Sequence, residues 1–309
     1  MKLLVTGGAG YIGSYITKYF AKMDDIKEIT SLDNLFFKQK FFEQSSKIKN
    51  VKGDVRDKIL MNNLYNKHDI IIPLAALVGA PLCKKYPDET NEINFQAIDN
   101  MCKEISSSQI VIMPVSNSGY GIGEKDKFCD EKSPLKPISL YGRTKVQAEK
   151  VIMERANSIS FRLATVFGVS DRMRIDLLVN NFTYIAYFEK YLEVFEPHFR
   201  RNYVHISDIF GAFKFSIMNF EKIKGEIYNL GLSEANLTKE QLCNKIQEVI
   251  SDFNYVISKD GTDEDKRDYF VSNEKIEKKG FKAKFKLENG IKELVKLYSS
   301  PNFVPSKNY

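Results

Sequence analysis

The chain has 309 residues, of which 43% are hydrophobic and 28% charged, a composition typical of a globular protein with a sizeable core and unlike that of a disordered chain. Its net charge of +6 is a modest excess of 46 Lys and Arg over 40 Asp and Glu; no basic stripe is interleaved with aromatic residues, which argues against nucleic acid as a partner. The four cysteines form no C-x-x-C pair and only three histidines occur, which argues against a disulfide framework or a zinc site.

Apolar segments of strand length alternate with amphipathic segments of helix length through the first half of the chain. The expected strands are 2–6, 28–33, 49–54, 69–75, 109–116 and 159–168, and the expected helices are 11–23, 56–68, 86–108 and 139–156. Continuous apolar strands that alternate with helices are typical of a parallel sheet covered on both faces. The predicted fold class is therefore α/β, with a doubly wound parallel (Rossmann) sheet.

The regular alternation of expected strands and helices ends near residue 170. The second half reads as helices over 171–190, 237–250 and 287–300, a turn and helix over 202–220, and strands over 190–196, 226–232 and 253–258. We predict a Rossmann domain over 1–169 and a smaller mixed α/β lobe over 170–309, with some strands returning to the main sheet. A second ligand is expected in the cleft between the two. The lysine-rich run 274–286 alternates with apolar residues and glutamates, which favours a solvated face.

No segment of the sequence indicates a membrane protein. The longest apolar run, 71–82, is too short to span a bilayer and contains two prolines. The first residues enter a strand-like run, with no basic segment followed by a cleavable apolar core. We therefore expect a cytoplasmic protein without a membrane partner.

Three glycines follow the first expected strand at G-x-x-G-x-x-G spacing, where a helix begins. In this context Gly7 permits a tight turn, Gly10 lets the backbone approach a pyrophosphate, and Gly13 lets the helix pack on the strand. The first helical N–H groups, around Tyr11 and Ile12, and the positive end of the helix dipole favour an anion. A plain turn needs no glycine at the third position, where it costs about 1 kcal/mol relative to alanine.

Asp33 ends the second expected strand, 20 residues after Gly13. A carboxylate there can accept hydrogen bonds from the adenosine ribose hydroxyls of a dinucleotide. The next residues are Asn34 and Leu35, and no cation follows before Lys38, so a 2′-phosphate would be repelled and NAD is favoured over NADP. The alternative is a turn or helix-capping role for Asp33.

A similar acid follows the third expected strand in the sequence KGDVRD, 52–57. Asp54 and Val55 are placed to meet an adenine ring, by the backbone and by the apolar side chain. Taken alone this signal is weak, because an aspartate at this position also caps the following helix.

Tyr141 and Lys145 lie four residues apart in an expected helix, so both side chains share one face. A tyrosine titrates near 10 and is a poor base at neutral pH unless nearby positive charge favours the phenolate. Lys145 can supply that charge and hold the nicotinamide ribose. Ser116 ends the strand 109–116 at the edge of the sheet where ligands of such folds bind, and it can hydrogen-bond the oxygen that Tyr141 deprotonates. An ordinary surface helix and a turn serine are the alternatives.

Together these motifs resemble the extended short-chain dehydrogenase/reductase family, specifically its NAD-dependent nucleotide-sugar epimerases and dehydratases. The resemblance rests on TGGAGYIGS (6–14), Asp33, GDVRD (53–57), PLAA (73–76), SNSGYG (116–121), YGRTK (141–145), RLATVFG (162–168) and RNYVHISD (201–208). It implies an enzyme that keeps NAD bound while a sugar C4 hydroxyl loses a proton to Tyr141 and a hydride to the nicotinamide. Ser116, Tyr141 and Lys145 then form the catalytic triad.

The same resemblance assigns the remaining contacts. Leu74, Ala75 and Ala76 would line the cofactor, and Asn94 would help to hold the loop around it. Arg201 and Arg267 would clamp the phosphates of a nucleotide-diphosphate sugar, a role that suits guanidinium groups. The further candidates for substrate binding are Asn117, Ser118, Arg174 and Asn180. A homodimer is implied as well, through a four-helix bundle whose outer faces would include Phe95, Ile98, Val146 and Met153.

The residues that follow Ser116 reduce the number of reactions of this family that the chain is expected to catalyse. In the related 4,6-dehydratases an Asp-Glu pair follows and performs the elimination, whereas this chain has Asn117 and Ser118, neither of which is a suitable proton shuttle. A 3,5-epimerase would need a cysteine and lysine pair near the sugar, and Cys129 is the only cysteine close to this motif. A C4 epimerase and a C4 dehydrogenase stay open, including a GDP-heptose dehydrogenase of capsule or surface-polysaccharide biosynthesis. A non-catalytic NAD-binding regulator or scaffold is the alternative from another class.

Overall fold

A seven-stranded parallel sheet forms the centre of the computed structural model, which describes residues 1–41, 45–124, 127–258 and 267–308. Its strands run in the order β11-β7-β5-β4-β1-β2-β3. They are β1 (Lys2–Thr6), β2 (Glu28–Asp33), β3 (Ile48–Lys52), β4 (Ile70–Pro73), β5 (Ile110–Ser116), β7 (Ser158–Leu163) and β11 (Glu226–Leu230). Strand order reverses between β1 and β4, so a crevice opens beyond the carboxyl ends of these two strands. The predicted fold class is confirmed.

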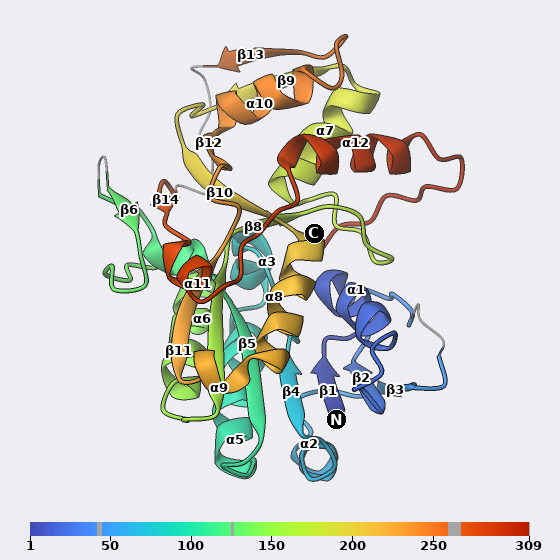
Figure 1. Cartoon of the computed structure of the whole chain (residues 1–309). Coiled ribbons are helices and arrows are strands. Elements are labelled where there is room, and N and C mark those ends of the chain that lie inside the picture. The colour runs from blue at the N-terminus through green and yellow to red at the C-terminus, as the bar shows by residue number, and fades with distance from the viewer. Residues whose placement is uncertain (42–44, 125–126, 259–266, 309) are drawn as a thin grey trace.

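Helices cover both faces of this sheet (Figure 1). They are α1 (Tyr11–Phe20), α2 (Lys58–Tyr65), α3 (Ala80–Lys85), α5 (Ala97–Glu104), α6 (Leu140–Ile152), α8 (Ile206–Met218), α9 (Phe220–Ile223) and α11 (Glu274–Lys278). Alternation along β1 sends Leu3 and Val5 into one core with α1 and α8, and Leu4 into the other with α2, α5 and α6. Both faces of the sheet are thus apolar, which explains the continuous hydrophobic strands of the sequence.

Three expected elements differ from the structure. The helix expected over 86–108 is divided into α4 (Pro87–Asn91), a π-helical turn η1 (Glu92–Gln96) and α5. The segment 159–168 leaves the main sheet after β7 and continues as β8 (Thr165–Phe167), which pairs with β10 (Arg200–His205). The turn expected before α8 is this strand β10. Periodicity alone could not separate β8 from β7, because both are short apolar runs.

The second lobe has a core of its own and lies above the main sheet in Figure 1. It contains α7 (Leu178–Phe188), α10 (Lys239–Gln247), α12 (Leu287–Tyr298), and the parallel pair β9 (Tyr191–Phe195) and β13 (Asn254–Ser258). Between the lobes lie β8, β10 and β12 (Asn236–Thr238), a 3₁₀ turn η2 (Asn117–Tyr120), and the pair β6 (Phe128–Cys129) and β14 (Phe270–Val271). The tail after α12 returns to the junction of the lobes, where the backbone of Ile175 donates to the carbonyl of Ser306.

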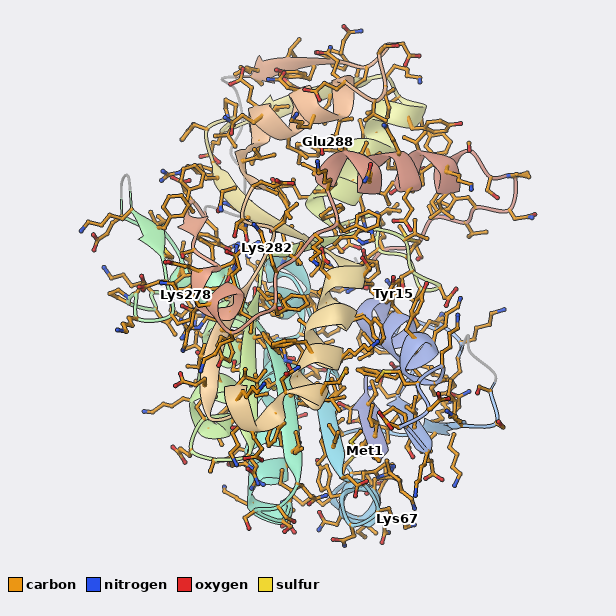
Figure 2. The ribbon with its side chains drawn as sticks, in the orientation of Figure 1. Met1, Tyr15, Lys67, Lys278, Lys282 and Glu288 are labelled. Atoms are coloured by element: carbon orange, nitrogen blue, oxygen red, sulfur yellow. The ribbon has the colours of Figure 1, made fainter. Side chains whose placement is uncertain are left out.

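The lysine-rich segment around α11 has a solvated outer face, as its pattern predicts. Lys278 and Lys282, both labelled in Figure 2, are exposed, whereas Ile276 and Ala283 are buried. Among the residues that the structure describes, no helix is long and apolar enough to cross a membrane.

Candidate functional site

A cavity of about 670 Å³ lies between the two lobes, beyond the carboxyl ends of β1, β2, β4 and β5. Its wall from the main lobe carries the glycine-rich turn, Asp33, the loop after β4, and the end of β5. Its wall from the second lobe is formed by the start of α7, by β9, by Arg201 of β10 and by Arg267, which precedes β14. The cavity therefore joins both groups of residues singled out in the sequence.

The glycine-rich turn forms one end of the cavity, where Gly7, Gly10, Tyr11, Ile12 and Gly13 all line the wall. Gly7 has φ = +71°, and a Cβ added there would lie 2.7 Å from the backbone nitrogen of Ala75. A Cβ on Gly13 would collide with the carbonyl of Gly7. Since α1 starts here, its first N–H groups point toward the cavity without helical acceptors. These residues fit a dinucleotide pyrophosphate.

Asp33 lies beside this turn and is 6% exposed. It accepts hydrogen bonds from the backbone N–H groups of Ala9 (3.1 Å) and Leu35 (2.8 Å) and from Nε2 of Gln39 (3.0 Å). Burial raises the pKa of Asp33, and the two backbone N–H donors together with the nearby Arg172 oppose the rise. Two carboxylate oxygens offer about four acceptor sites, so one acceptor site is left for a ribose hydroxyl. Asn34 lines the cavity next to it.

The side chain of Asp54 is engaged away from the cavity, so the expected adenine contact of this residue stays a prediction for its backbone alone. Arg56 binds its carboxylate through Nε (2.9 Å) and Nη2 (2.9 Å), and Nδ2 of Asn34 donates to it as well (2.9 Å). The guanidinium of Arg56 is the main cause that lowers the pKa of Asp54 to about 2. Held in this way, Asp54 stays outside the cavity wall, which is formed here by Gly53 and Val55.

The loop after β4 carries Leu74, Ala75 and Ala76 along the cavity. Asn94 does not line the cavity; it is fully buried in the π-helical turn η1. Its Oδ1 accepts from the N–H of Leu77 and its Nδ2 donates to the carbonyl of Leu77, both at 2.9 Å. Asn94 therefore fixes this loop from the side away from the cavity. The π-helical turn η1 positions Asn94 for these two hydrogen bonds.

Ser116, Tyr141 and Lys145 meet at the middle of the cavity, and all three line it. Ser116 ends β5, while Tyr141 and Lys145 lie one turn apart on α6, whose start is capped by Ser139. Burial raises the pKa of Tyr141, as does Cys83, whereas Arg267, Arg174 and a hydrogen bond with Ser116 lower it. Burial also lowers the pKa of Lys145 to about 8. Burial in this site thus disfavours both the phenolate of Tyr141 and the ammonium of Lys145.

The structure contradicts the expected substrate contacts of Asn117 and Ser118. The 3₁₀ turn η2 that follows β5 carries both side chains into the interior, where they are 1% and 2% exposed, and neither lines the cavity. Among the described residues, their side-chain polar atoms have no hydrogen-bond partner. The N–H of Ser118 donates to Oγ of Ser116 (3.1 Å), so this turn orients the Ser116 hydroxyl instead.

Three arginines from separate segments line the cavity next to Tyr141: Arg174, Arg201 and Arg267. Nε of Arg174 donates to Asp176 (3.1 Å), and the guanidinium of Arg201 donates to the carbonyls of Arg200 and Arg267. The ring of Tyr269 supports Arg201 at 5.7 Å. Guanidinium groups bind phosphate oxygens in pairs of hydrogen bonds, so this wall fits a diphosphate.

The expected diphosphate contact by Asn180 is wrong. Asn180 is fully buried; its Oδ1 accepts from the N–H of Gly168 (3.1 Å) and its Nδ2 donates to the carbonyl of Arg174 (2.9 Å). The next residue of α7, Asn181, lines the cavity. Successive helical residues point about 100° apart, and the sequence pattern did not decide which of the two asparagines faces inward.

Sequence reasoning missed several lining residues of the second lobe: Arg172, Leu177, Asn181, Phe182, Glu193, Phe195, Lys239 and Asn308. Six of them fall in two short segments, 172–182 and 193–195, and Lys239 and Asn308 lie far from both. Arg172 reaches the cofactor end of the cavity, where its guanidinium lies 5.2 Å from the ring of Phe37. The charged Glu193 within the apolar strand 190–196 is the one signal that the sequence offered.

A family model for the NAD dependent epimerase/dehydratase family matches residues 3–231 of the chain. The chain belongs to this family. It is therefore an enzyme with NAD as its cofactor, and the residues at the glycine-rich end of the cavity fit that group. The family that the sequence motifs resemble is thus confirmed.

Relatives within the family include both epimerases and dehydratases. A UDP-glucose 4-epimerase of Lactobacillus helveticus is 28% identical over 55% of this chain, which spans only 52% of that relative. A dTDP-D-glucose 4,6-dehydratase of Mus musculus is 28% identical over 99% of this chain and 91% of its own length. The fold resembles a dTDP-glucose 4,6-dehydratase of Bacillus anthracis solved with NAD, with a TM-score of 0.82, 20% identity, and 98% and 97% coverage of the two chains. A UDP-glucose 4-epimerase of Thermotoga maritima gives a TM-score of 0.78 at 22% identity, with 96% and 98% coverage.

Proposed function

We propose that this enzyme oxidises C4 of a nucleotide-diphosphate sugar, as a C4 epimerase or a C4 dehydrogenase. One observation carries the proposal: Ser116, Tyr141 and Lys145 share a single cavity with Arg174, Arg201 and Arg267. A sugar next to Tyr141 would place its diphosphate against the arginines. The glycine-rich turn and Asp33 occupy the opposite end, where the adenosine half of the cofactor would bind.

Each member of the triad has a distinct task in this reaction. The phenolate of Tyr141 takes the proton of the sugar C4 hydroxyl, and Ser116 donates a hydrogen bond to the same oxygen. Lys145 binds the nicotinamide ribose, and its charge favours the phenolate, whose formation burial opposes. Bound NAD supplies the hydride acceptor. Arg174 and Arg267 help to lower the pKa of Tyr141, so the residues that bind phosphate also support the base.

The surroundings of Ser116 favour these two outcomes over a 4,6-dehydratase or a 3,5-epimerase. Asn117 and Ser118 replace the acidic pair of a dehydratase, and both face the interior. Cys129 is buried in β6 among Tyr120, Tyr269 and Val271 and does not line the cavity. With no proton shuttle at either place, reversible oxidation at C4 is the chemistry that this set of residues supports.

The finer assignments stay predictions. A GDP-heptose substrate, a role in capsule or surface-polysaccharide biosynthesis and a homodimer are implied by the family resemblance of the sequence, whereas a cytoplasmic location is expected from the sequence pattern alone. The expected dimer face needs one revision: Ile98 is buried in the core of the main lobe, while Phe95, Val146 and Met153 remain partly exposed. Light scattering of the purified protein at micromolar concentration tests the dimer, and a monomer would contradict it.

A panel of UDP-, GDP-, CDP- and dTDP-sugars, including GDP-heptoses, tests the proposed reaction. We expect a ketosugar two mass units lighter together with NADH for a C4 dehydrogenase. An isomer of unchanged mass without net NADH is the result for a C4 epimerase. Loss of water from any sugar of the panel would contradict the proposal and indicate a dehydratase.

A further inference from the structure

Glu193 on β9 is an acidic side chain in the wall of a cavity that has to hold a diphosphate. We propose that its carboxylate binds the nucleobase of the substrate and selects guanine. The inference rests on the proposed function, because it needs a nucleotide-diphosphate sugar in this cavity. It adds a specificity-determining residue and the chemical identity of the base.

The order of the groups along the cavity places the base near β9. The reacting sugar lies at Tyr141 and its diphosphate at Arg201 and Arg267. The nucleoside must then continue into the second lobe, away from the main sheet. There the wall is formed by the start of α7, by β9 and by Lys239, and β9 lies at the far end of this lobe from the main sheet (Figure 1).

Glu193 lies in the middle of β9, in a stretch of three consecutive residues, Glu193 to Phe195, that all line the cavity. Val194 is buried in the core of the second lobe, and successive strand residues point to opposite faces, so Glu193 and Phe195 share the face opposite to Val194. The side chain of Glu193 is exposed, and among the described residues no donor is within hydrogen-bond or ion-pair distance of it. Lys239, close by, donates to the carbonyl of Phe195 (2.8 Å).

The other two acids of the described cavity wall are already engaged. Asp33 accepts three hydrogen bonds at the cofactor end. Asp176 binds the guanidinium of Arg174 and the N–H of Asn308. Of these three acids, Glu193 is the one whose carboxylate accepts no hydrogen bond from a described residue. A carboxylate close to a diphosphate repels it, so binding is favourable only if another part of the ligand donates hydrogen bonds to Glu193.

Guanine is the base whose edge matches a carboxylate. Its N1–H and its N2 amino group are adjacent donors, so both oxygens of Glu193 can accept at once in charge-assisted hydrogen bonds. Uracil and thymine offer one N–H group between two carbonyl oxygens, and a carboxylate repels both of these oxygens. Cytosine and adenine offer one amino group next to an acceptor nitrogen. Leu177, Phe182 and Phe195 supply apolar surface for the faces of the ring.

Binding of nucleoside diphosphates to the NAD-loaded enzyme tests this inference without a known sugar. We would measure dissociation constants of GDP, IDP, UDP and dTDP by isothermal titration calorimetry. The wild-type protein should bind GDP at least about tenfold more tightly than UDP or dTDP. IDP, which lacks only the N2 amino group, should bind more weakly than GDP. In Glu193→Ala the preference for GDP over IDP and over UDP should disappear.

Glu189→Gln is the matched control, because Glu189 is exposed at the end of α7 and lies outside the cavity wall. It should keep the binding profile of the wild type. UDP or dTDP binding as tightly as GDP would overturn the role of Glu193 and leave the proposed function intact. An equal loss for all four ligands in Glu193→Ala would indicate a ribose contact and would overturn base selection. Failure of every nucleoside diphosphate to bind would overturn the proposed function itself.

Discussion

The two ends of the cavity are built in different ways. The cofactor end is made of backbone and of short local motifs: one turn with three glycines, an acid at the end of the next strand, and a loop fixed by Asn94. The substrate end is made of side chains from α7, β9, β10 and the segment at Arg267, which are far apart in sequence. The cofactor end is thus fixed by the fold, whereas the substrate end is a set of replaceable side chains on the same frame.

Tyr141→Phe should have the largest effect of the changes considered. It removes the base and leaves the shape of the cavity, so we expect kcat to fall by a factor of about 10³. NAD content should stay unchanged, since the glycine-rich end is untouched. Pre-steady-state reduction of bound NAD by the sugar measures this, and unchanged reduction would remove Tyr141 from the mechanism.

Gly7→Ala should disrupt the cofactor end. The new Cβ would lie 2.7 Å from the backbone of Ala75 at φ = +71°, and we expect loss of bound NAD and destabilisation by about 1–3 kcal/mol. Gly225→Ala is the matched control, because Gly225 has φ = +72° and a Cβ there comes no closer than 3.7 Å to its neighbours. Retention of NAD in Gly7→Ala would contradict the account of this turn.

Arg267→Ala should affect the substrate end alone. We expect KM to rise about tenfold through loss of charge-assisted contacts with the diphosphate, with full NAD content. Because Arg267 also lowers the pKa of Tyr141, the rising limb of the pH–rate profile should move to higher pH. If kcat/KM changes but the rising limb stays at the same pH, Arg267 binds the substrate and does not influence the pKa of Tyr141.

Lys145→Met should raise the stability of the NAD-free protein while it abolishes turnover. The folded-state pKa of Lys145 is about 8, below the ordinary 10.5, so the buried ammonium opposes folding fully below pH 8. This penalty fades as pH rises from 8 to 10.5. We therefore expect the variant to be more stable by about 1–3 kcal/mol at pH 7, with the difference lost near pH 10.5. Urea unfolding at both pH values measures it, and a less stable variant at pH 7 would contradict the buried charge.

The sequence predicted the sheet, its helices and most of the cofactor end, because glycine spacing and apolar periodicity act locally. It failed where a side chain had two choices of direction. Asn180 and Asn181 are neighbours on one helix, and only the packing of α7 decides that Asn181 faces the cavity. Asn117 and Ser118 turn inward because a 3₁₀ turn follows β5. Arg172 and Glu193 reach the cavity only through the tertiary arrangement of the second lobe.

Transfer of the C4 hydrogen is the most direct test of the central claim that this cavity oxidises C4 of a nucleotide sugar. Nucleotide-diphosphate sugars carrying deuterium at C4 would be mixed with the NAD-loaded enzyme and quenched rapidly within the first turnover, before an epimerase returns the hydride to the sugar, and the cofactor would be analysed by mass spectrometry. The account predicts deuterium in the nicotinamide of the wild type and none in Tyr141→Phe. Reduced cofactor without deuterium, from any sugar of the panel, would contradict oxidation at C4.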